Sequence, residues 1–214
     1  MQVVPIFPLG VVLFPGTRIP LHIFEPRYQA LVRDCLANDS HFGVVALRRG
    51  SDTESNPLWY EVGTLARIER VVRLPRGKLN LVIAGATRFQ AVRRVEGRPY
   101  LRAEVELVES RRSGASGLFA ATQLRRPFET YRRSLLSMGV IVPAFAELPK
   151  EPAELSWAVA NHLVIELRAK QRLLEESDPI ERLRLELSLL RRESVLLERN
   201  LANRLVETPF YSLN

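Results

Sequence analysis

The residue types that most often do chemistry are few in this sequence and lie far apart. The three histidines are His22, His41 and His162, and no H-E-x-x-H motif or similar pair of metal ligands occurs around them. The single cysteine, Cys35, can form no internal disulfide and no cysteine-based metal cluster. We therefore expect neither a metal ion nor another cofactor.

Motifs for nucleophilic catalysis and for phosphate binding are also absent from the sequence. No G-x-S-x-G nucleophile elbow occurs. The Gly77–Lys78 pair is followed by Leu79 and lacks the upstream glycine of a G-x-x-x-x-G-K-[ST] loop, so it cannot surround a phosphate in that way. These absences favour a binding protein over an enzyme.

Short β-like runs separated by glycine and proline turns fill the first half of the chain. In the clearest run, Leu101, Ala103 and Val105 alternate with charged residues, as in a strand with one buried face. Several such strands predict a compact β-barrel or sandwich, with a hairpin turn at residues 75–78. The expected strands are Val11–Phe14, Phe42–Leu47, Tyr60–Leu74, Leu79–Ala84, Arg88–Val95 and Leu101–Glu109.

One helix is expected inside this β-rich half. Pro26 suits a first helical turn, and the apolar residues that follow recur on one face. Those residues are Tyr28, Leu31, Val32, Cys35 and Leu36. Because Cys35 falls on this apolar face, we interpret it as a core thiol rather than a nucleophile.

The second half has the periodicity of helices. We expect a helix over Leu118–Met138 with a break at Pro127, and a second helix over Ala153–Leu174. A last helix begins at Ser177–Asp178–Pro179 and continues with leucines at three- and four-residue steps. The prediction is an α+β protein with a β-barrel domain at 1–112 and a helical bundle at 113–214, joined by a linker at 110–116. The last helix is longer than a small bundle needs, which leaves a homo-oligomer open.

Charge and hydropathy place limits on location and partners. The chain has 31 Lys and Arg against 24 Asp and Glu, a net charge of +7. Its arginines form scattered doublets near glutamates, which favours a solvated basic surface over a nucleic-acid footprint. The apolar N-terminus has no basic residue before Arg18 and is interrupted by prolines, unlike a signal peptide. With no apolar run long enough to cross a membrane, we expect a cytoplasmic protein.

Several segments resemble one known family. The segments Pro5–Gly16 (PIFPLGVVLFPG) and Ile19–Tyr28 (IPLHIFEPRY) are similar to the opening of the N-terminal domain of Lon proteases, found also in stand-alone bacterial proteins and in cereblon. Glu61–Ile68, Tyr100–Val105 and Lys170–Glu175 resemble later motifs of the same family, in the same order.

The resemblance implies a PUA-like β-barrel followed by a helical bundle that ends in a long helix. It also implies a non-catalytic module that binds unfolded or misfolded polypeptides, as a proteolysis adaptor or holdase working with an ATP-dependent protease. In full Lon proteases an ATPase and a protease domain follow, and this sequence ends at Asn214 before either. On the best-matched segment, the expected peptide-binding residues are Phe14, Pro20, His22, Phe24, Arg27 and Tyr28, although the apolar ones could instead pack the barrel.

RNA binding is the alternative hypothesis, because PUA-like folds include RNA-binding proteins. It would use a basic face of the barrel, although no aromatic residue for base stacking is interleaved there. The residues of that face are Arg67, Arg70, Arg73, Arg76 and Lys78.

Overall fold

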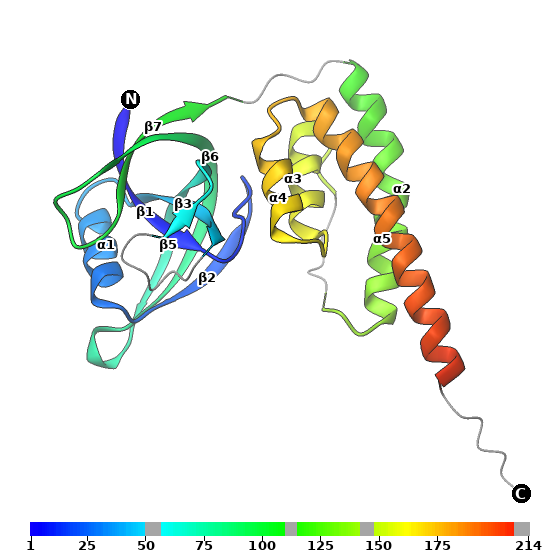
Figure 1. Ribbon diagram of the computed structural model, residues 1–214, viewed down its shortest axis with the longest axis horizontal. Coiled ribbons are helices and arrows are strands. Elements are labelled where there is room, and N and C mark those ends of the chain that lie inside the picture. Colours follow the sequence, from blue (N-terminus) through cyan, green and yellow to red (C-terminus); the bar gives the residue numbers. More distant parts are fainter. Residues whose placement is uncertain (50–56, 110–114, 142–147, 208–214) are drawn as a thin grey trace, which may run out of the picture. The chain divides into compact units, whose positions relative to one another are not determined.

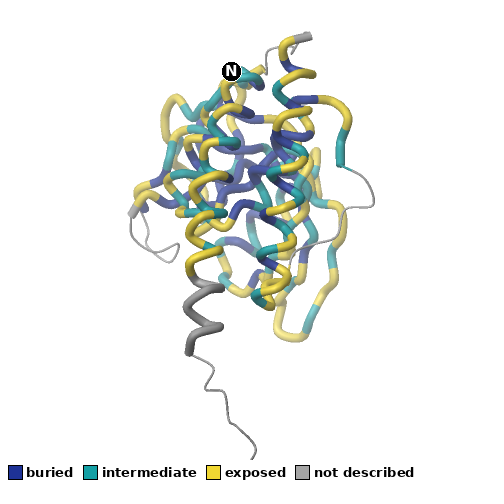
Figure 2. Tube along the Cα trace, turned by 90° about the vertical axis from the view of Figure 1, so that its right-hand side faces the viewer, coloured by how far each residue is buried: buried dark blue, intermediate teal, exposed yellow. Residues whose placement is uncertain are grey.

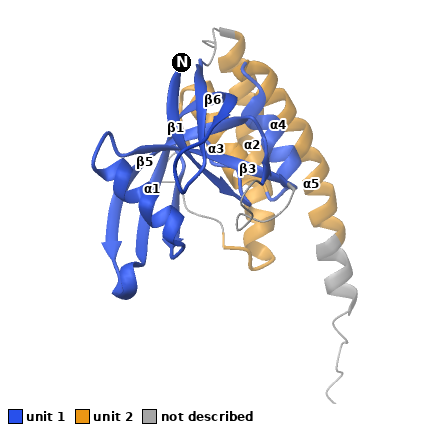
Figure 3. Ribbon diagram, turned by 60° about the vertical axis from the view of Figure 1, so that its left-hand side comes forward, with its two compact units in different colours: residues 1–111, 164–177 blue, residues 112–163, 178–214 orange. Residues whose placement is uncertain are grey.

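The computed structural model describes residues 1–49, 57–109, 115–141 and 148–207, with the side chains of 49, 115 and 200–207 excepted. The chain has the expected α+β content (Figure 1). Its contacts divide it into two compact units, the first of residues 1–111 and 164–177 and the second of 112–163 and 178–214 (Figure 3). The elements in order are β1 (Gln2–Leu9), β2 (Arg18–Ile23), α1 (Pro26–Leu36), β3 (His41–Arg49), β4 (Leu58–Trp59), β5 (Val62–Arg73), β6 (Leu79–Val95), β7 (Arg102–Val108), α2 (Ala115–Ser137), α3 (Pro152–His162), α4 (Leu167–Glu175) and α5 (Pro179–Glu207).

The first unit is built on a seven-stranded sheet with the order β1-β7-β6-β5-β3-β4, in which β2 pairs with β6. Strand β1 pairs with β7 in the antiparallel sense and with β3 in the parallel sense, so the pairing path returns to its first strand. Strands β2 and β4 each pair with a single described neighbour. The expected barrel is thus found as a sheet that is not fully closed.

One core cluster of the first unit lies between the sheet and α1. The rings of Phe7 and Tyr28 stack with their centroids 4.1 Å apart, and Leu31, Val32 and Cys35 of α1 are buried beside them. The predicted face of this helix is therefore the buried one, except that Leu36 is exposed. Figure 2 shows how far each described position is buried. Strand β3 is buried without interruption from Phe42 to Leu47.

The structure corrects the expected strand at Val11–Phe14. These residues form a loop between β1 and β2, two strands that the sequence did not predict because prolines interrupt them. The loop is held by hydrogen bonds instead of strand pairing. The Thr64 hydroxyl donates to the Leu13 carbonyl at 2.6 Å, and the Gly16 N–H donates to the Gly85 carbonyl at 2.9 Å.

A second correction concerns β6, which was expected as two strands separated at Gly85. Strand β6 is continuous, because β5 pairs with it along most of its length. The pairing register shifts at two places in β5, and the strands remain paired on both sides of each shift. Gly85 is required for another reason: a Cβ atom there would lie 2.4 Å from the carbonyl oxygen of Phe14. The β5–β6 hairpin forms as predicted, and Leu74 N–H donates to the Lys78 carbonyl across its turn at 2.8 Å.

The second unit consists of α2, α3 and α5. Helix α2 continues through Pro127, so the predicted break there is wrong. A proline costs the helix one backbone hydrogen bond, but residues on one face of α2 are buried on both sides of it and keep the helix in place. Those residues are Ala121, Leu124, Phe128, Tyr131 and Leu135.

Polar residues in the core of the second unit connect α3 to α5. Arg182 Nε donates to Ser156 Oγ at 2.6 Å, and that hydroxyl donates to Glu186 Oε1 at 2.6 Å. The guanidinium of Arg182 also lies 3.4 Å from the centre of the Trp157 ring. At the start of α5, Asp178 Oδ1 accepts the Ile180 N–H at 2.8 Å, which is the predicted N-cap.

The single helix expected over 153–174 is divided into two. The chain is extended at Leu163, with φ −64° and ψ 127°, and α4 then packs in the first unit. There the Gln171 side chain donates to the Val62 carbonyl at 3.0 Å, and Arg88 Nη1 donates to the Leu174 carbonyl at 2.8 Å. Residues 164–177 therefore belong with the sheet, whereas the sequence assigned all of 113–214 to the helical domain.

The expected linker at 110–116 lies largely outside the described residues. None of the described helices is long and apolar enough to cross a membrane.

Candidate functional site

The outer face of β2, β6 and β5 brings together residues from three separate segments. Along β2, Arg18, Pro20 and His22 are exposed while Ile19, Leu21 and Ile23 point toward the core side. The strand register places Pro20 opposite Val82, which in turn lies opposite Arg70. It also places His22 opposite Asn80, which lies opposite Val72. Two cross-strand rows therefore share one outer face.

These rows enclose a shallow hollow of about 400 Å³. Its walls are the apolar side chains of Pro20, Val72 and Val82 together with the polar side chains of His22, Arg70 and Asn80. Val72 is 41% exposed, which is high for a valine on a strand. This volume is at the lower end of the range for ligand-binding pockets, and polar groups lie at the edge of the hollow.

Phe24 lies next to this hollow and is the most exposed aromatic residue of the matched segment, at 56%. Its ring centre is 5.9 Å from that of His22. His22 Nδ1 lies 2.7 Å from Asn80 Oδ1, and because an amide oxygen can only accept, Nδ1 carries the proton. That contact leaves His22 Nε2 for solvent or a ligand. The arrangement presents an apolar ring and a hydrogen-bonding group side by side.

Other residues expected at the site are in the core. Phe14 is fully buried and Tyr28 is 3% exposed, so neither side chain lies on the surface. Arg27 is half-buried, with Nε donating to Glu25 Oε2 at 2.9 Å and the guanidinium 4.5 Å from the centre of the Tyr28 ring. Of the six expected residues, the structure brings Pro20, His22 and Phe24 together on the outer face.

The five basic residues of the RNA hypothesis are exposed but do not share one face. Arg67 is paired with Glu69 at 3.3 Å, and the same carboxylate pairs with Arg18 at 2.7 Å. Arg70 lines the outer hollow, whereas Arg73 lines a separate pocket beside α1. Arg76 and Lys78 follow in the hairpin turn.

Three residues of the hollow, Val72, Asn80 and Val82, were not predicted from the sequence. The alternation of Leu79, Leu81 and Ile83 with the outer residues of β6 was a usable signal, since it assigns Asn80 and Val82 to the opposite face. Within the described residues no group of three or more His, Cys, Asp or Glu side chains could hold a metal ion. Cys35 is buried, and burial is the main cause that raises the pKa of its thiol to about 12.

Residues 3–192 match the family model described as the ATP-dependent protease La (LON) substrate-binding domain. The chain belongs to this family. The Lon substrate-binding family thus covers both units of the chain, and the role that its description names is substrate binding.

Full-length Lon proteases and solved Lon domains are similar to this chain. Lon protease 2 of Myxococcus xanthus is 31% identical over 203 residues, which are 92% of this chain and 24% of that protein. Lon protease of Anaeromyxobacter dehalogenans is 29% identical over 202 residues, again 24% of its length. The chain therefore spans about a quarter of the length of these relatives.

Two solved structures have the same fold. A Lon N-terminal domain protein from Xanthomonas campestris is 29% identical with a TM-score of 0.65, covering 88% of this chain and 98% of that one. The N-terminal domain of a Mycobacterium avium complex Lon protease has a TM-score of 0.67 with the same coverage, and its 19% identity supports the fold alone.

Proposed function

We propose that this chain is a non-catalytic module that binds exposed apolar segments of unfolded or misfolded polypeptides through the outer face of β2, β6 and β5. Membership of the Lon substrate-binding family supports the class of ligand. The observation that carries the choice of surface is the hollow of about 400 Å³ beside the exposed ring of Phe24. A hollow with apolar walls and a few polar groups at its edge is the kind of site that takes an apolar side chain of a ligand.

The edge of β2 gives a second reason for this surface. Strand β2 pairs with β6 on one side, and no described strand pairs with its other side. An extended polypeptide could add to that edge as a further strand. Pro20 has no N–H to contribute, so the side-chain contacts in the hollow would supply more of the affinity than the backbone would.

As a wider role, the module would deliver bound polypeptides to an ATP-dependent protease as an adaptor, or keep them from aggregating as a holdase. Both roles need the same surface, since each begins with capture of an apolar segment. They differ in whether degradation by a protease speeds up when the module is added.

The test is binding of the full chain to a fluorescently labelled unfolded polypeptide and to a short RNA, each across a salt series. We expect polypeptide binding that changes little with salt, because the contacts are mainly apolar. Phe24→Ala should weaken it by about tenfold, whereas Phe119→Ala, which removes another exposed ring on α2, should leave it unchanged.

Binding to RNA alone, falling steeply with salt, would reject this proposal in favour of the basic residues. Loss of polypeptide binding in Phe119→Ala but not in Phe24→Ala would reject the surface.

A further inference from the structure

A second, larger pocket of about 770 Å³ lies where the start of α1 meets the connection between β6 and β7. Four arginines line it: Arg27, Arg94, Arg98 and Arg102. The lining carboxylates are only Glu25 and Glu96. The pocket therefore carries an excess of positive charge.

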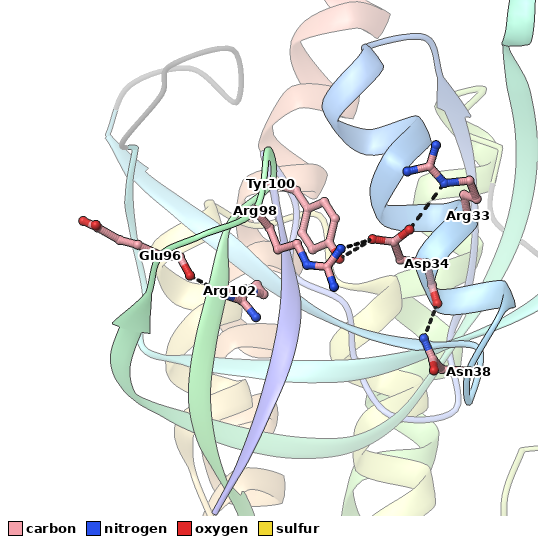
Figure 4. A network of polar contacts seen from close by, with 7 residues as sticks. All are labelled: Arg33, Asp34, Asn38, Glu96, Arg98, Tyr100 and Arg102. Atoms are coloured by element: carbon pink, nitrogen blue, oxygen red, sulfur yellow. Dashed lines mark hydrogen bonds and ion pairs between the residues drawn. The ribbon is translucent and has the colours of Figure 1, made fainter.

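Two of these arginines are neutralised by carboxylates. Arg27 pairs with Glu25 at 2.9 Å, and Arg98 pairs with Asp34 of α1 at 3.3 Å. Asp34 also accepts the Tyr100 hydroxyl at 2.8 Å, and that hydrogen bond is the main cause that lowers the pKa of Asp34 (Figure 4). Asp34 thus stays ionised and keeps Arg98 in place.

The other two arginines have only neutral partners among the described residues. Arg94 Nη2 donates to the Pro57 carbonyl at 2.8 Å, with its guanidinium 3.8 Å from the centre of the Trp59 ring. Arg102 Nη2 donates to the Glu96 carbonyl, while the carboxylate of Glu96 points away from Arg102 (Figure 4). The Nε of Arg102 is buried and has no hydrogen-bond partner in the described part of the chain. Neither guanidinium has a paired anion in the described part of the chain, and a carboxylate is the partner that such a planar set of donors binds most strongly.

We propose that this pocket binds a carboxylate of the captured polypeptide, either an acidic side chain or the C-terminal carboxylate. The inference rests on the proposed function, because the carboxylate is carried by the segment that the outer face of β2 binds. The reach is short: Arg27 follows Phe24 by three residues, so their Cα atoms are no more than about 11 Å apart. An extended peptide covers that distance with about three residues, so a segment bound at Phe24 can continue to the part of the pocket lined by Arg27.

A polypeptide fits this pocket better than a nucleic acid does. Glu25 and Glu96 lie in the lining, and they would repel the closely spaced phosphates of RNA. A single carboxylate meets that repulsion only once, and the two arginines without paired carboxylates outweigh it.

The test compares three short fluorescein-labelled peptides on the full chain. They share an apolar sequence and differ in one group: an Asp with an amidated C-terminus, an Asn with an amidated C-terminus, and the same Asn with a free C-terminal carboxylate. We expect the Asp peptide or the free-carboxylate peptide to bind about tenfold more tightly than the neutral one, as charge-assisted hydrogen bonds require. The more tightly bound of the two shows whether the carboxylate comes from a side chain or the terminus.

Variants then place the effect in the pocket. Arg102→Gln should reduce the preference to about twofold or less, and Arg94→Gln gives a second test should the first variant unfold. Arg93→Gln is the matched control, since it removes the same charge from the neighbouring position of β6, where Arg93 pairs with Glu104 at 2.5 Å. It should keep the full preference.

Equal affinity for the three peptides would overturn this inference and leave the proposed function standing. A preference that Arg93→Gln reduces as much as Arg102→Gln would overturn it also, because the effect would then be one of net charge. If none of the peptides binds, both the inference and the proposed function fail. A short RNA that displaces the Asp peptide, and whose binding Arg102→Gln abolishes, would reassign the pocket to phosphate.

Discussion

His22 of β2 and Asn80 of β6 are joined by a hydrogen bond of 2.7 Å between Nδ1 and Oδ1 on the outer face of the sheet. The two residues are cross-strand partners, so the bond holds the imidazole at a defined place in the wall of the hollow. A wall that is ordered before binding reduces the side-chain entropy lost when a ligand enters. The apolar site therefore depends on a polar pair at its edge.

This pair gives the first prediction. Asn80→Ala removes the acceptor and frees the ring of His22, so we expect polypeptide binding to weaken by about threefold. Because both side chains are exposed, the free energy of unfolding should change by less than about 1 kcal/mol. Fluorescence anisotropy and urea unfolding measure the two quantities, and a large loss of stability with normal binding would contradict the role given to the pair.

Arg88 should be important for the stability of the first unit. It is 1% exposed, and Nη1 donates to the carbonyls of Leu174 and Glu176 at 2.8 and 3.1 Å. Arg88→Met leaves buried carbonyls without donors, and we expect a loss of about 3 kcal/mol. Urea unfolding measures the loss, and hydrogen exchange should report faster opening of α4. Arg93→Met, on the exposed part of the same strand, should cost less than about 1 kcal/mol. Equal losses in the two variants would show that Arg88 does not anchor α4.

Gly85 should tolerate no side chain. Its Cβ position is 2.4 Å from the Phe14 carbonyl oxygen, so Gly85→Ala must displace the loop before β2 at a cost of about 2 kcal/mol or more. Gly10→Ala is the control, because no heavy atom lies within 4 Å of its Cβ position, and its stability should change by less than about 1 kcal/mol. Thermal unfolding of both variants decides the matter, and similar melting temperatures would contradict the predicted clash.

Cys35 should be unreactive in the folded protein. Burial raises the pKa of its thiol from 9.0 to about 12, so almost no thiolate is present near pH 8. The raised pKa also means that this group stabilises the fold below pH 9 and that its contribution is lost as the pH rises toward 12. A thiol reagent at pH 8 should modify the chain only after denaturant is added. Rapid modification of the native protein would contradict the burial.

The α+β content and several elements could be predicted because their signals are local. Pro26 and the apolar face of α1 are within one helix, and Asp178 accepts the N–H of Ile180, only two residues further along the chain. The division between α3 and α4 could not be predicted, since no proline or glycine marks it. It follows from tertiary contacts, in which Gln171 and Leu174 of α4 bind to the sheet of the first unit.

The candidate site could be predicted only in part for a related reason. Pro20, His22 and Phe24 came from the motif that resembles the Lon family, and all three lie at the surface. Their neighbours Val72 and Val82 come from the β5–β6 hairpin, whose register shifts between Ile68 and Arg70. A shift of one residue in strand pairing changes which face of the sheet a side chain occupies. Which residues line the hollow therefore depends on how β5 and β6 pair in the folded protein, and the sequence alone does not give this register.

The most direct test of the account is to place a charge in the hollow and measure polypeptide binding. Val72 and Val92 are both exposed strand valines, at 41% and 50%, but only Val72 lines the hollow. We predict that Val72→Asp weakens binding of a fluorescent unfolded polypeptide by at least about tenfold, while Val92→Asp stays within about twofold of the unchanged protein. Equal binding by both variants, with both correctly folded, would contradict the assignment of the outer face of β2, β6 and β5 as the polypeptide-binding surface.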